Sequence, residues 1–93
     1  MLELRKNCEH CGKNLPNESS EAMICSFECT FCTDCVENVL HNVCPNCGGG
    51  LERRPTRPHK LLVKSPMRAD RVFAPIEFNK FLIINKHIEP RKR

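Results

Sequence analysis

The sequence predicts a small α+β domain that depends on bound metal ions for its stability, followed by an irregular basic tail. Three observations lead to this fold class. The chain has 93 residues, of which 40% are hydrophobic and eight are cysteine, with no Trp or Tyr. All eight cysteines fall within residues 8–47, and most of the basic residues come after them. A chain of this size buries too little apolar surface to be stable through its core alone, so it needs crosslinks.

The cysteines occur in pairs with the spacing of metal ligands. There are three CxxC pairs and one CxxxC pair, formed by Cys8, Cys11, Cys25, Cys29, Cys32, Cys35, Cys44 and Cys47. A tight turn lets the two cysteines of a pair direct both sulfurs at one ion, and four pairs supply two tetrahedral sites. Zinc favours this geometry and these soft ligands. We therefore expect two structural zinc ions held by all eight cysteines.

A disulfide framework is the alternative use of eight cysteines. Residues 1–13 contain neither the long apolar stretch nor the cleavage motif of a secretory signal, and the chain has no apolar run long enough to span a membrane. We therefore expect a cytoplasmic protein without membrane association, whose thiols stay reduced. This expectation favours metal binding over disulfides.

Local patterns predict one short hairpin and the turns of two metal knuckles. Residues 22–31 contain strand-forming residues on both sides of Cys25 and Cys29, which favours a hairpin around these two cysteines. Gly12 and Gly48 directly follow the first and the last cysteine pair. Glycine at these positions allows the positive φ with which a knuckle turns its backbone N–H groups toward the sulfurs.

A short helix is predicted over 35–41. Asp34 fits an N-cap, with Glu37 as its capping-box partner. The residues at helical spacing that follow are Val36, Val39 and Leu40. The small core between the two ions is expected to come from the hairpin, the helix and the turn after it, and to consist of Met23, Ile24, Phe27, Phe31, Val36, Val39, Leu40 and Val43.

Charge is divided unevenly along the chain. Residues 1–52 hold three basic and eight acidic residues, a net charge of −5, and residues 53–93 hold twelve basic and three acidic residues, a net charge of +9. Eight thiolates and two divalent ions add a further −4 to the first segment. We therefore divide the chain into a double-zinc domain at 1–52 and a basic, Pro-containing, partly ordered tail at 53–93.

The basic tail suggests two uses. Its clusters at 52–60 and 89–93 favour contacts with nucleic-acid phosphates, but no aromatic residue lies beside either cluster to stack on bases. Otherwise the tail is solvated, or folds back on the acidic first segment. Residues 78–88 form its one markedly apolar run, which fits a short strand, a short helix or a segment that binds a partner.

Two ways of sharing the eight ligands are compatible with their spacing. Sequential pairing places Cys8, Cys11, Cys25 and Cys29 on one ion, as in a zinc ribbon. Interleaved pairing joins the first pair to the third, and the second pair to the fourth. The order of the pairs, the helix after the sixth ligand and the closing sequence CPNC resemble the RING family over residues 8–47. The resemblance implies a RING-like, treble-clef or cross-brace fold, with Cys8, Cys11, Cys32 and Cys35 on one zinc ion and Cys25, Cys29, Cys44 and Cys47 on the other.

A second resemblance covers residues 1–55. The segments LELRKNCEHCGKNLP, ICSFECTFCTDC and CPNCGGGLERRP resemble a family of small, uncharacterised bacterial eight-cysteine proteins, a domain of unknown function. This resemblance implies the fold and the metal but no activity.

These features together predict a structural zinc-binding module for protein–protein interaction or regulation. Two closed all-cysteine sites leave no open coordination position, and no catalytic set is evident, so we do not expect an enzyme. The alternatives are a RING-type ubiquitin ligase and nucleic-acid binding through the tail. The ligase family has an apolar residue inside the first knuckle and often a basic residue after the last ligand, and here these positions hold His10 and Gly48. Leu40 and Pro45 match the other two contact positions of that family.

Overall fold

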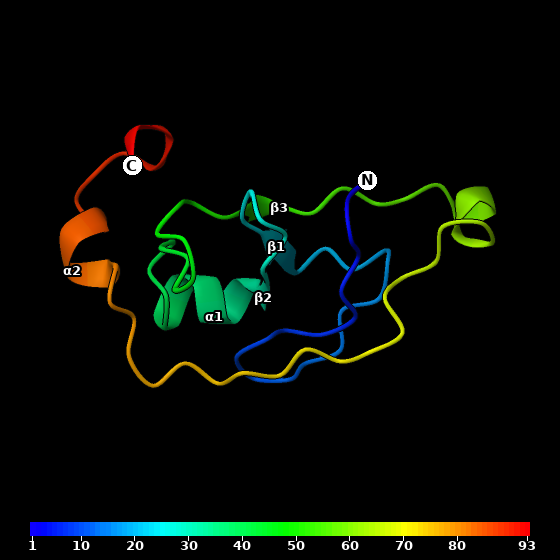
Figure 1. The fold of residues 1–93 in the computed structure, drawn as a ribbon, viewed down its shortest axis with the longest axis horizontal. Helices are drawn as coiled ribbons and strands as arrows, with labels where there is room; N and C mark the ends of the chain where they lie inside the picture. The colour runs from blue at the N-terminus through cyan, green and yellow to red at the C-terminus, as the bar shows by residue number, and fades with distance from the viewer.

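The computed structural model describes residues 1–93, which form a three-stranded antiparallel sheet, a short helix beside it and a long C-terminal segment that runs around both (Figure 1). The strands and helices are β1 (Ala22–Ile24), β2 (Thr30–Cys32), α1 (Thr33–Asn38), β3 (Glu52–Arg53) and α2 (Leu82–Asn85), with two 3-10 turns, η1 (His59–Leu62) and η2 (Pro90–Lys92). The predicted α+β class is confirmed at this level. None of the helices has the length and hydropathy of a membrane span.

The predicted hairpin is formed by β1 and β2. Its register places Ala22 opposite Cys32 and Ile24 opposite Thr30. At its tip, the backbone N–H of Cys25 donates to the carbonyl of Cys29 over 3.2 Å. The tip therefore holds the second cysteine pair at one end of the sheet.

The third strand, β3, is not anticipated by the sequence analysis. It pairs antiparallel with β1, with Met23 opposite Arg53 and Ile24 opposite Glu52, so the strand order is β2-β1-β3. The boundary at 52/53 lies inside this strand, and the backbone N–H of Arg54 also donates to the carbonyl of Ala22 over 2.9 Å. The C-terminal segment thus begins as part of the sheet.

The helix begins two residues earlier than predicted and lacks the predicted cap. Cys32 is the N-cap residue and no side chain caps the helix, so Asp34 lies in the first turn rather than ahead of it. Because β2 leads directly into α1, both the backbone N–H and the hydroxyl of Thr33 bind the carbonyl of Glu21, at 2.8 and 3.1 Å. This contact fixes the start of the helix. The predicted capping box between Asp34 and Glu37 is therefore wrong.

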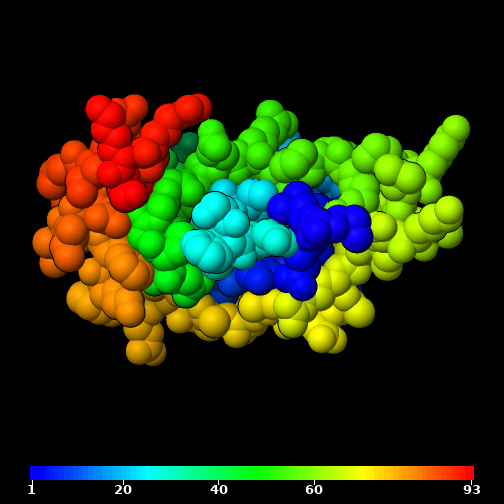
Figure 2. Space-filling view, turned by 45° about the horizontal axis from the view of Figure 1, so that its top comes forward, coloured from blue at the N-terminus to red at the C-terminus, as the bar shows by residue number.

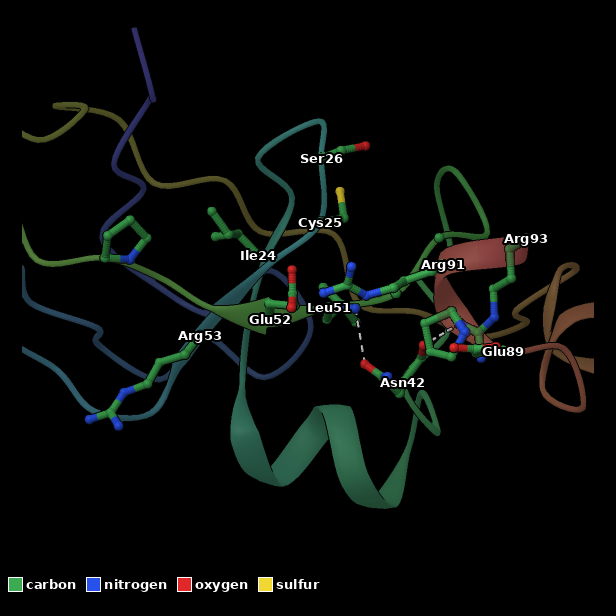
Figure 3. A pocket seen from close by; sticks show the side chains of 14 residues that line it. Ile24, Cys25, Ser26, Asn42, Leu51, Glu52, Arg53, Glu89, Arg91 and Arg93 are labelled. Carbon is green, nitrogen blue, oxygen red and sulfur yellow. Dashed lines mark hydrogen bonds between the residues drawn. The ribbon is translucent and has the colours of Figure 1, made fainter.

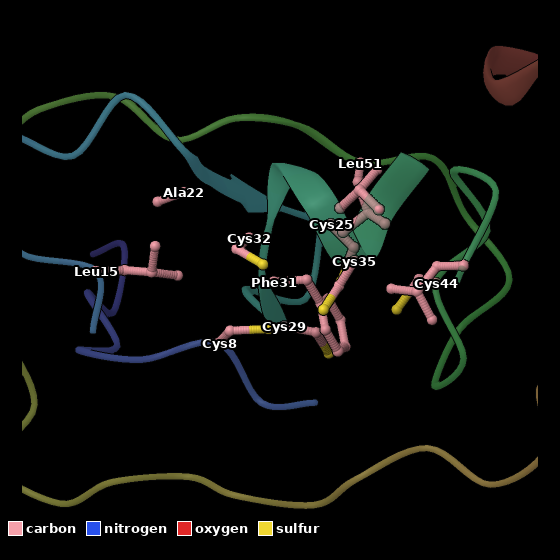
Figure 4. Close-up of a cluster of buried hydrophobic side chains, with 12 residues drawn as sticks. Cys8, Leu15, Ala22, Cys25, Cys29, Phe31, Cys32, Cys35, Cys44 and Leu51 are labelled. Carbon is pink, nitrogen blue, oxygen red and sulfur yellow. The ribbon is translucent and has the colours of Figure 1, made fainter. Parts of the chain in front are cut away.

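The core contains half of the predicted apolar residues, together with cysteines. Phe31, Val36, Leu40 and Val43 are buried, and Met23 and Ile24 are partly buried. The prediction that Phe27 and Val39 are buried is wrong. Phe27, at the hairpin tip, is 70% exposed, and Val39, just after α1, is 40% exposed. The buried apolar residues that the prediction missed are Leu4, Leu15, Ala22 and Leu51. Figure 4 shows that cysteine side chains make up much of the cluster around Phe31.

The C-terminal segment folds back on the first segment. From β3 it extends to η1 at one end of the molecule, returns alongside the N-terminal segment and reaches α2 at the opposite end (Figure 1). The backbone N–H of Arg68 donates to the carbonyl of Leu4 over 2.8 Å, and Asn7 exchanges side-chain hydrogen bonds with the backbone of Val72. The apolar run at 78–88 contains only the single turn of α2.

Candidate metal centres

Four cysteine sulfurs gather in a first cluster, formed by Cys8, Cys11, Cys32 and Cys35. All four sulfurs lie within 4.8 Å of one another, and the sulfurs of Cys11 and Cys32 are 3.8 Å apart. A tetrahedral zinc ion with Zn–S bonds of about 2.3 Å separates its sulfurs by about 3.8 Å. All four are free thiols rather than disulfides, and three of them are buried. The donor set therefore fits a tetrahedral thiolate-bound metal.

Two local structures place these four sulfurs. The first knuckle, residues 8–12, is closed by a hydrogen bond from the N–H of Gly12 to the carbonyl of Cys8 over 2.9 Å, and Gly12 has the predicted positive φ of 81°. Cys32 ends β2, and Cys35 lies in the first turns of α1. Because the helix follows the strand without a loop, the third cysteine pair is held rigidly opposite the first knuckle.

A second cluster lies at the hairpin tip. The sulfurs of Cys25, Cys44 and Cys47 are within 4.8 Å of one another, and Cys29 is not in this group of three. Cys29 nevertheless lies beside it: the backbone N–H of Cys25 donates to the carbonyl of Cys29 over 3.2 Å, and a hydrogen bond with Cys29 lowers the pKa of Cys25 to about 3. Asn46 also donates its side-chain N–H to the sulfur of Cys29 over 3.3 Å. The predicted fourth ligand is therefore at the rim of the cluster.

The second knuckle, residues 44–48, repeats the geometry of the first. The N–H of Gly48 donates to the carbonyl of Cys44 over 2.8 Å, and Gly48 has a φ of 80°. The N–H of Gly49 points at the sulfur of Cys47 over 3.4 Å, and the N–H of Phe27 at the sulfur of Cys25 over 3.3 Å. Backbone donors of this kind stabilise a thiolate.

The thiol pKa values show why each cluster favours a bound cation. In the first cluster, burial raises the pKa of Cys35 and of Cys32. In the second, the hydrogen bond with Cys25 is the largest cause that raises the pKa of Cys44. Closely packed thiolates repel one another, so the thiols of a cluster cannot all ionise unless a cation compensates the charge. A metal ion would provide that compensation.

The sulfurs gather in the interleaved manner and not in the sequential one. Cys8 and Cys11 lie with Cys32 and Cys35, whereas Cys25 lies with the last pair. No histidine belongs to either cluster. His10, inside the first knuckle, instead accepts a hydrogen bond at Nδ1 from the backbone N–H of Ile76 over 2.9 Å.

A buried carboxylate beside the first cluster was not found by sequence reasoning. Glu9, within the first knuckle, is 4% exposed and accepts hydrogen bonds from Arg5, over 2.8 Å, and from the backbone N–H of Thr30. Glu9 therefore ties the knuckle to β2. Arg5 and Glu9 are four residues apart with opposite charges, which is a detectable pattern, but nothing in the sequence indicates that the pair is buried.

Gly48→Ala is expected to destabilise the protein by about 1–3 kcal/mol, because alanine strains at positive φ and a Cβ would overlap its neighbours. A Cβ at Gly48 would lie 2.6 Å from the side-chain nitrogen of Asn85 and 2.9 Å from the ring of Phe81. Denaturant unfolding of the zinc-saturated protein measures the loss. Gly49→Ala is the control, since a Cβ there meets only the sulfur of Cys47, at 3.5 Å. Equal losses would contradict the expectation.

The fold and the two clusters together define a small, cysteine-rich α+β protein with two candidate metal sites. Residues 1–57 match the family described as a protein of unknown function (DUF1272), and the chain belongs to this family, as its cysteine-rich segments predicted. It is 56% identical over 75 residues to an uncharacterized protein of Rhizobium meliloti (strain 1021), covering 81% of this chain and 89% of that protein. No solved structure matches the chain.

Proposed function

We propose that this protein is a structural zinc-binding module that serves protein–protein interaction or regulation, and that it has no catalytic site. One observation carries the proposal: the sulfurs of Cys8, Cys11, Cys32 and Cys35 lie within 4.8 Å of one another. The sulfurs of Cys11 and Cys32 are 3.8 Å apart, the separation in a zinc tetrathiolate. Four protein ligands close a zinc site to water and substrate, so such a site stabilises the fold rather than activating a reactant.

The second site of the proposal consists of Cys25, Cys29, Cys44 and Cys47. Its fourth ligand, Cys29, lies beside the other three, since Asn46 of the second knuckle donates to the sulfur of Cys29 over 3.3 Å and hydrogen bonds with Cys29 act on the pKa values of Cys25 and Cys44. Interleaved sites of this kind give a RING-like cross-brace, with the hairpin and α1 between the two ions. Six of the 14 buried hydrophobic residues are cysteines, which fits a core whose cohesion depends on metal–sulfur bonds.

Two of the four positions that a ligase would use are in contact with the C-terminal segment. His10 binds the backbone of Ile76, and Gly48 lies under Phe81 and Asn85. These contacts favour an interaction module over a ubiquitin ligase. A ligase would accelerate the discharge of ubiquitin from a conjugating enzyme loaded with ubiquitin. Such acceleration would overturn our proposal in favour of the ligase.

Most of the arginines of the tail are bound within the molecule. Five of its arginines donate hydrogen bonds to residues 1–52, namely Arg54, Arg57, Arg68, Arg71 and Arg93. Arginines held in this way are not free to follow a phosphate backbone, so a protein partner is favoured over nucleic acid. Affinity capture of the zinc-loaded protein from its native cells should yield one defined protein even after nuclease treatment. Binding that requires nucleic acid and falls steeply with salt would support the alternative.

Native mass spectrometry tests the metal sites directly. We expect two zinc ions in the intact protein, one in Cys8→Ser or Cys32→Ser, and still one in the double variant, because these cysteines share an ion. As the matched control, Cys8→Ser combined with Cys44→Ser should lose both ions. One ion in the intact protein, four disulfides, or loss of both ions from the Cys8 and Cys32 double variant would overturn the proposal.

A further inference from the structure

We propose that residues 68–93, which we call the strap, lock both metal knuckles, so that strap docking and metal occupancy stabilise each other. The inference rests on the proposed metal sites and goes beyond them, because it assigns the C-terminal segment a role in holding the metal. The strap contacts the first knuckle with its first half and the second knuckle with its second half. In Figure 2 the strap, coloured yellow to red, lies against the N-terminal segment and the loop that carries the second knuckle.

The first half of the strap donates hydrogen bonds to a backbone carbonyl and to a side chain of the first knuckle. The N–H of Ala74 donates to the carbonyl of Glu9 over 2.8 Å, and the N–H of Ile76 donates to Nδ1 of His10 over 2.9 Å. Both acceptors lie between the two cysteines of the knuckle. Movement of these cysteines away from an ion would therefore break strap contacts.

Side chains of the strap pack over Gly12 at the end of the same knuckle. A Cβ at Gly12 would lie 3.4 Å from the ring of Phe73 and 3.7 Å from the guanidinium of Arg71. That guanidinium donates to the carbonyl of Gly12 over 2.6 Å and to the side chain of Asn14 over 2.7 Å. The turn that orients the sulfurs is thus also a docking surface for the strap.

The second half of the strap repeats these contacts on the second knuckle. The side-chain amide of Asn79 donates to the carbonyl of Val43 over 2.9 Å, immediately before the knuckle. The side-chain amide of Asn85 donates to the carbonyl of Gly48 over 2.9 Å, and Phe81 lies against the same glycine. Two asparagines therefore hold the backbone at both ends of the knuckle.

The end of the strap closes one side of a groove beside the second cluster (Figure 3). The groove encloses about 950 Å³, and Cys25 is among its lining residues. Pro90 packs on Gly50, and Arg93 donates to the carbonyl of Asn42. Asn42 in turn accepts a hydrogen bond from the N–H of Leu51 over 3.0 Å. The last residues of the chain are thus tied to the loops that flank the second knuckle.

Little within the strap would hold its shape if the knuckles opened. Its regular structure is limited to the single turns α2 and η2, and it contributes no fully buried residue, although the partly buried Ile76 packs against the core. Isolated turns of this length are not stable in water. Its order therefore depends on its contacts with the knuckles and with the residues just before the first knuckle. Linkage requires that the strap in turn strengthens metal binding by the same factor. Metal loss would release a segment with seven basic and three acidic residues.

Metal transfer to a chromophoric chelator tests the first direction of this coupling. In the full-length zinc-loaded protein, Asn79→Ala combined with Asn85→Ala should accelerate release of one zinc ion, and Arg71→Ala should accelerate release of the other. Each lost hydrogen bond should speed release about 2- to 12-fold. The controls are Lys86→Ala and Arg53→Ala, two exposed basic residues without hydrogen bonds to a knuckle, which should release zinc at the wild-type rate. Wild-type rates in the strap variants would overturn the inference.

Amide hydrogen exchange tests the reverse direction. The N–H groups of Ala74 and Ile76 should be protected in the zinc-loaded protein and lose that protection when a chelator is added. In Cys47→Ser, these two amides should stay protected while the N–H of Asn85 exchanges faster. Amides of the strap that exchange equally fast with and without zinc would overturn the inference and leave the metal sites intact. If native mass spectrometry finds no bound zinc, the proposed function itself fails.

Discussion

Removing the proposed zinc ions is expected to unfold residues 1–52. Structural zinc sites contribute about 10–16 kcal/mol to folding in small domains, whereas a whole domain is stable by about 5–15 kcal/mol. Without metal, the core here is reduced to a few apolar side chains around Phe31, and unpaired thiols replace the two crosslinks. Excess chelator should therefore abolish the circular-dichroism signal of the sheet and α1 and collapse the dispersion of the amide resonances.

Zinc added back should restore the folded spectrum, and magnesium should not, because thiolates are soft ligands. Acid should act like the chelator: protons compete with the metal for the thiolates, so metal affinity falls as the pH falls. A protein that keeps its amide dispersion in chelator at neutral pH would contradict the prediction. It would show that the few apolar side chains alone stabilise the fold.

Arg54→Met is expected to destabilise the zinc-loaded protein by about 2–5 kcal/mol. Arg54 is only 3% exposed, and its guanidinium donates to the carbonyls of Arg5, Leu15 and Pro16 over 2.7, 3.1 and 2.9 Å. Burial lowers the pKa of Arg54, and no carboxylate lies against it. Methionine fills a similar volume but leaves the carbonyls of Arg5 and Leu15 without their donor, while the carbonyl of Pro16 keeps only the N–H of Ser19.

Arg53→Met is the matched control, because Arg53, the neighbour of Arg54 in the chain, is exposed in β3 and makes no side-chain hydrogen bond. The loss of stability in this variant should stay within about 0.5 kcal/mol. Arg54→Lys should recover little, since a single ammonium group cannot reach carbonyls that the planar guanidinium spans. Denaturant unfolding at saturating zinc measures all three variants. Similar losses for Met at positions 53 and 54 would show that the buried guanidinium does not bridge the segments.

Together, these two predictions separate the forces that hold the two parts of the chain. Metal–sulfur bonds would join the knuckles to the hairpin and α1, and Arg54 joins the N-terminal segment to the start of the C-terminal segment. The first force depends on metal supply and pH, while the second does not. Mild metal depletion should therefore free one or both halves of the strap while the contacts of Arg54 persist until the sheet unfolds.

The amino-acid sequence by itself determined the features that depend on local chemistry. The pair spacing indicated the metal chemistry, and seven of the eight cysteines lie in two tight sulfur groups, with Cys29 at the rim of the second. Gly12 and Gly48 have the positive φ that a knuckle turn needs. The hairpin also follows from local pattern. Within a cysteine pair, a knuckle turn or the hairpin, the interacting residues are close together in the chain, so the sequence contains the cause. The grouping of the first cysteine pair with the third joins residues far apart in the chain and depends on the fold.

Only the tertiary structure decided the features that arise from distant contacts. The start of α1 depends on a carbonyl at Glu21, which overrides the capping pattern at Asp34. The third strand exists because β1 offers a free edge to residues far along the chain. The local sequence pattern does not predict the burial of Arg54 or the order of the strap, since polar and charged residues normally indicate a solvent-exposed segment. Here they are ordered because the backbone carbonyls of the knuckles and of the N-terminal segment need donors that the small sheet cannot supply.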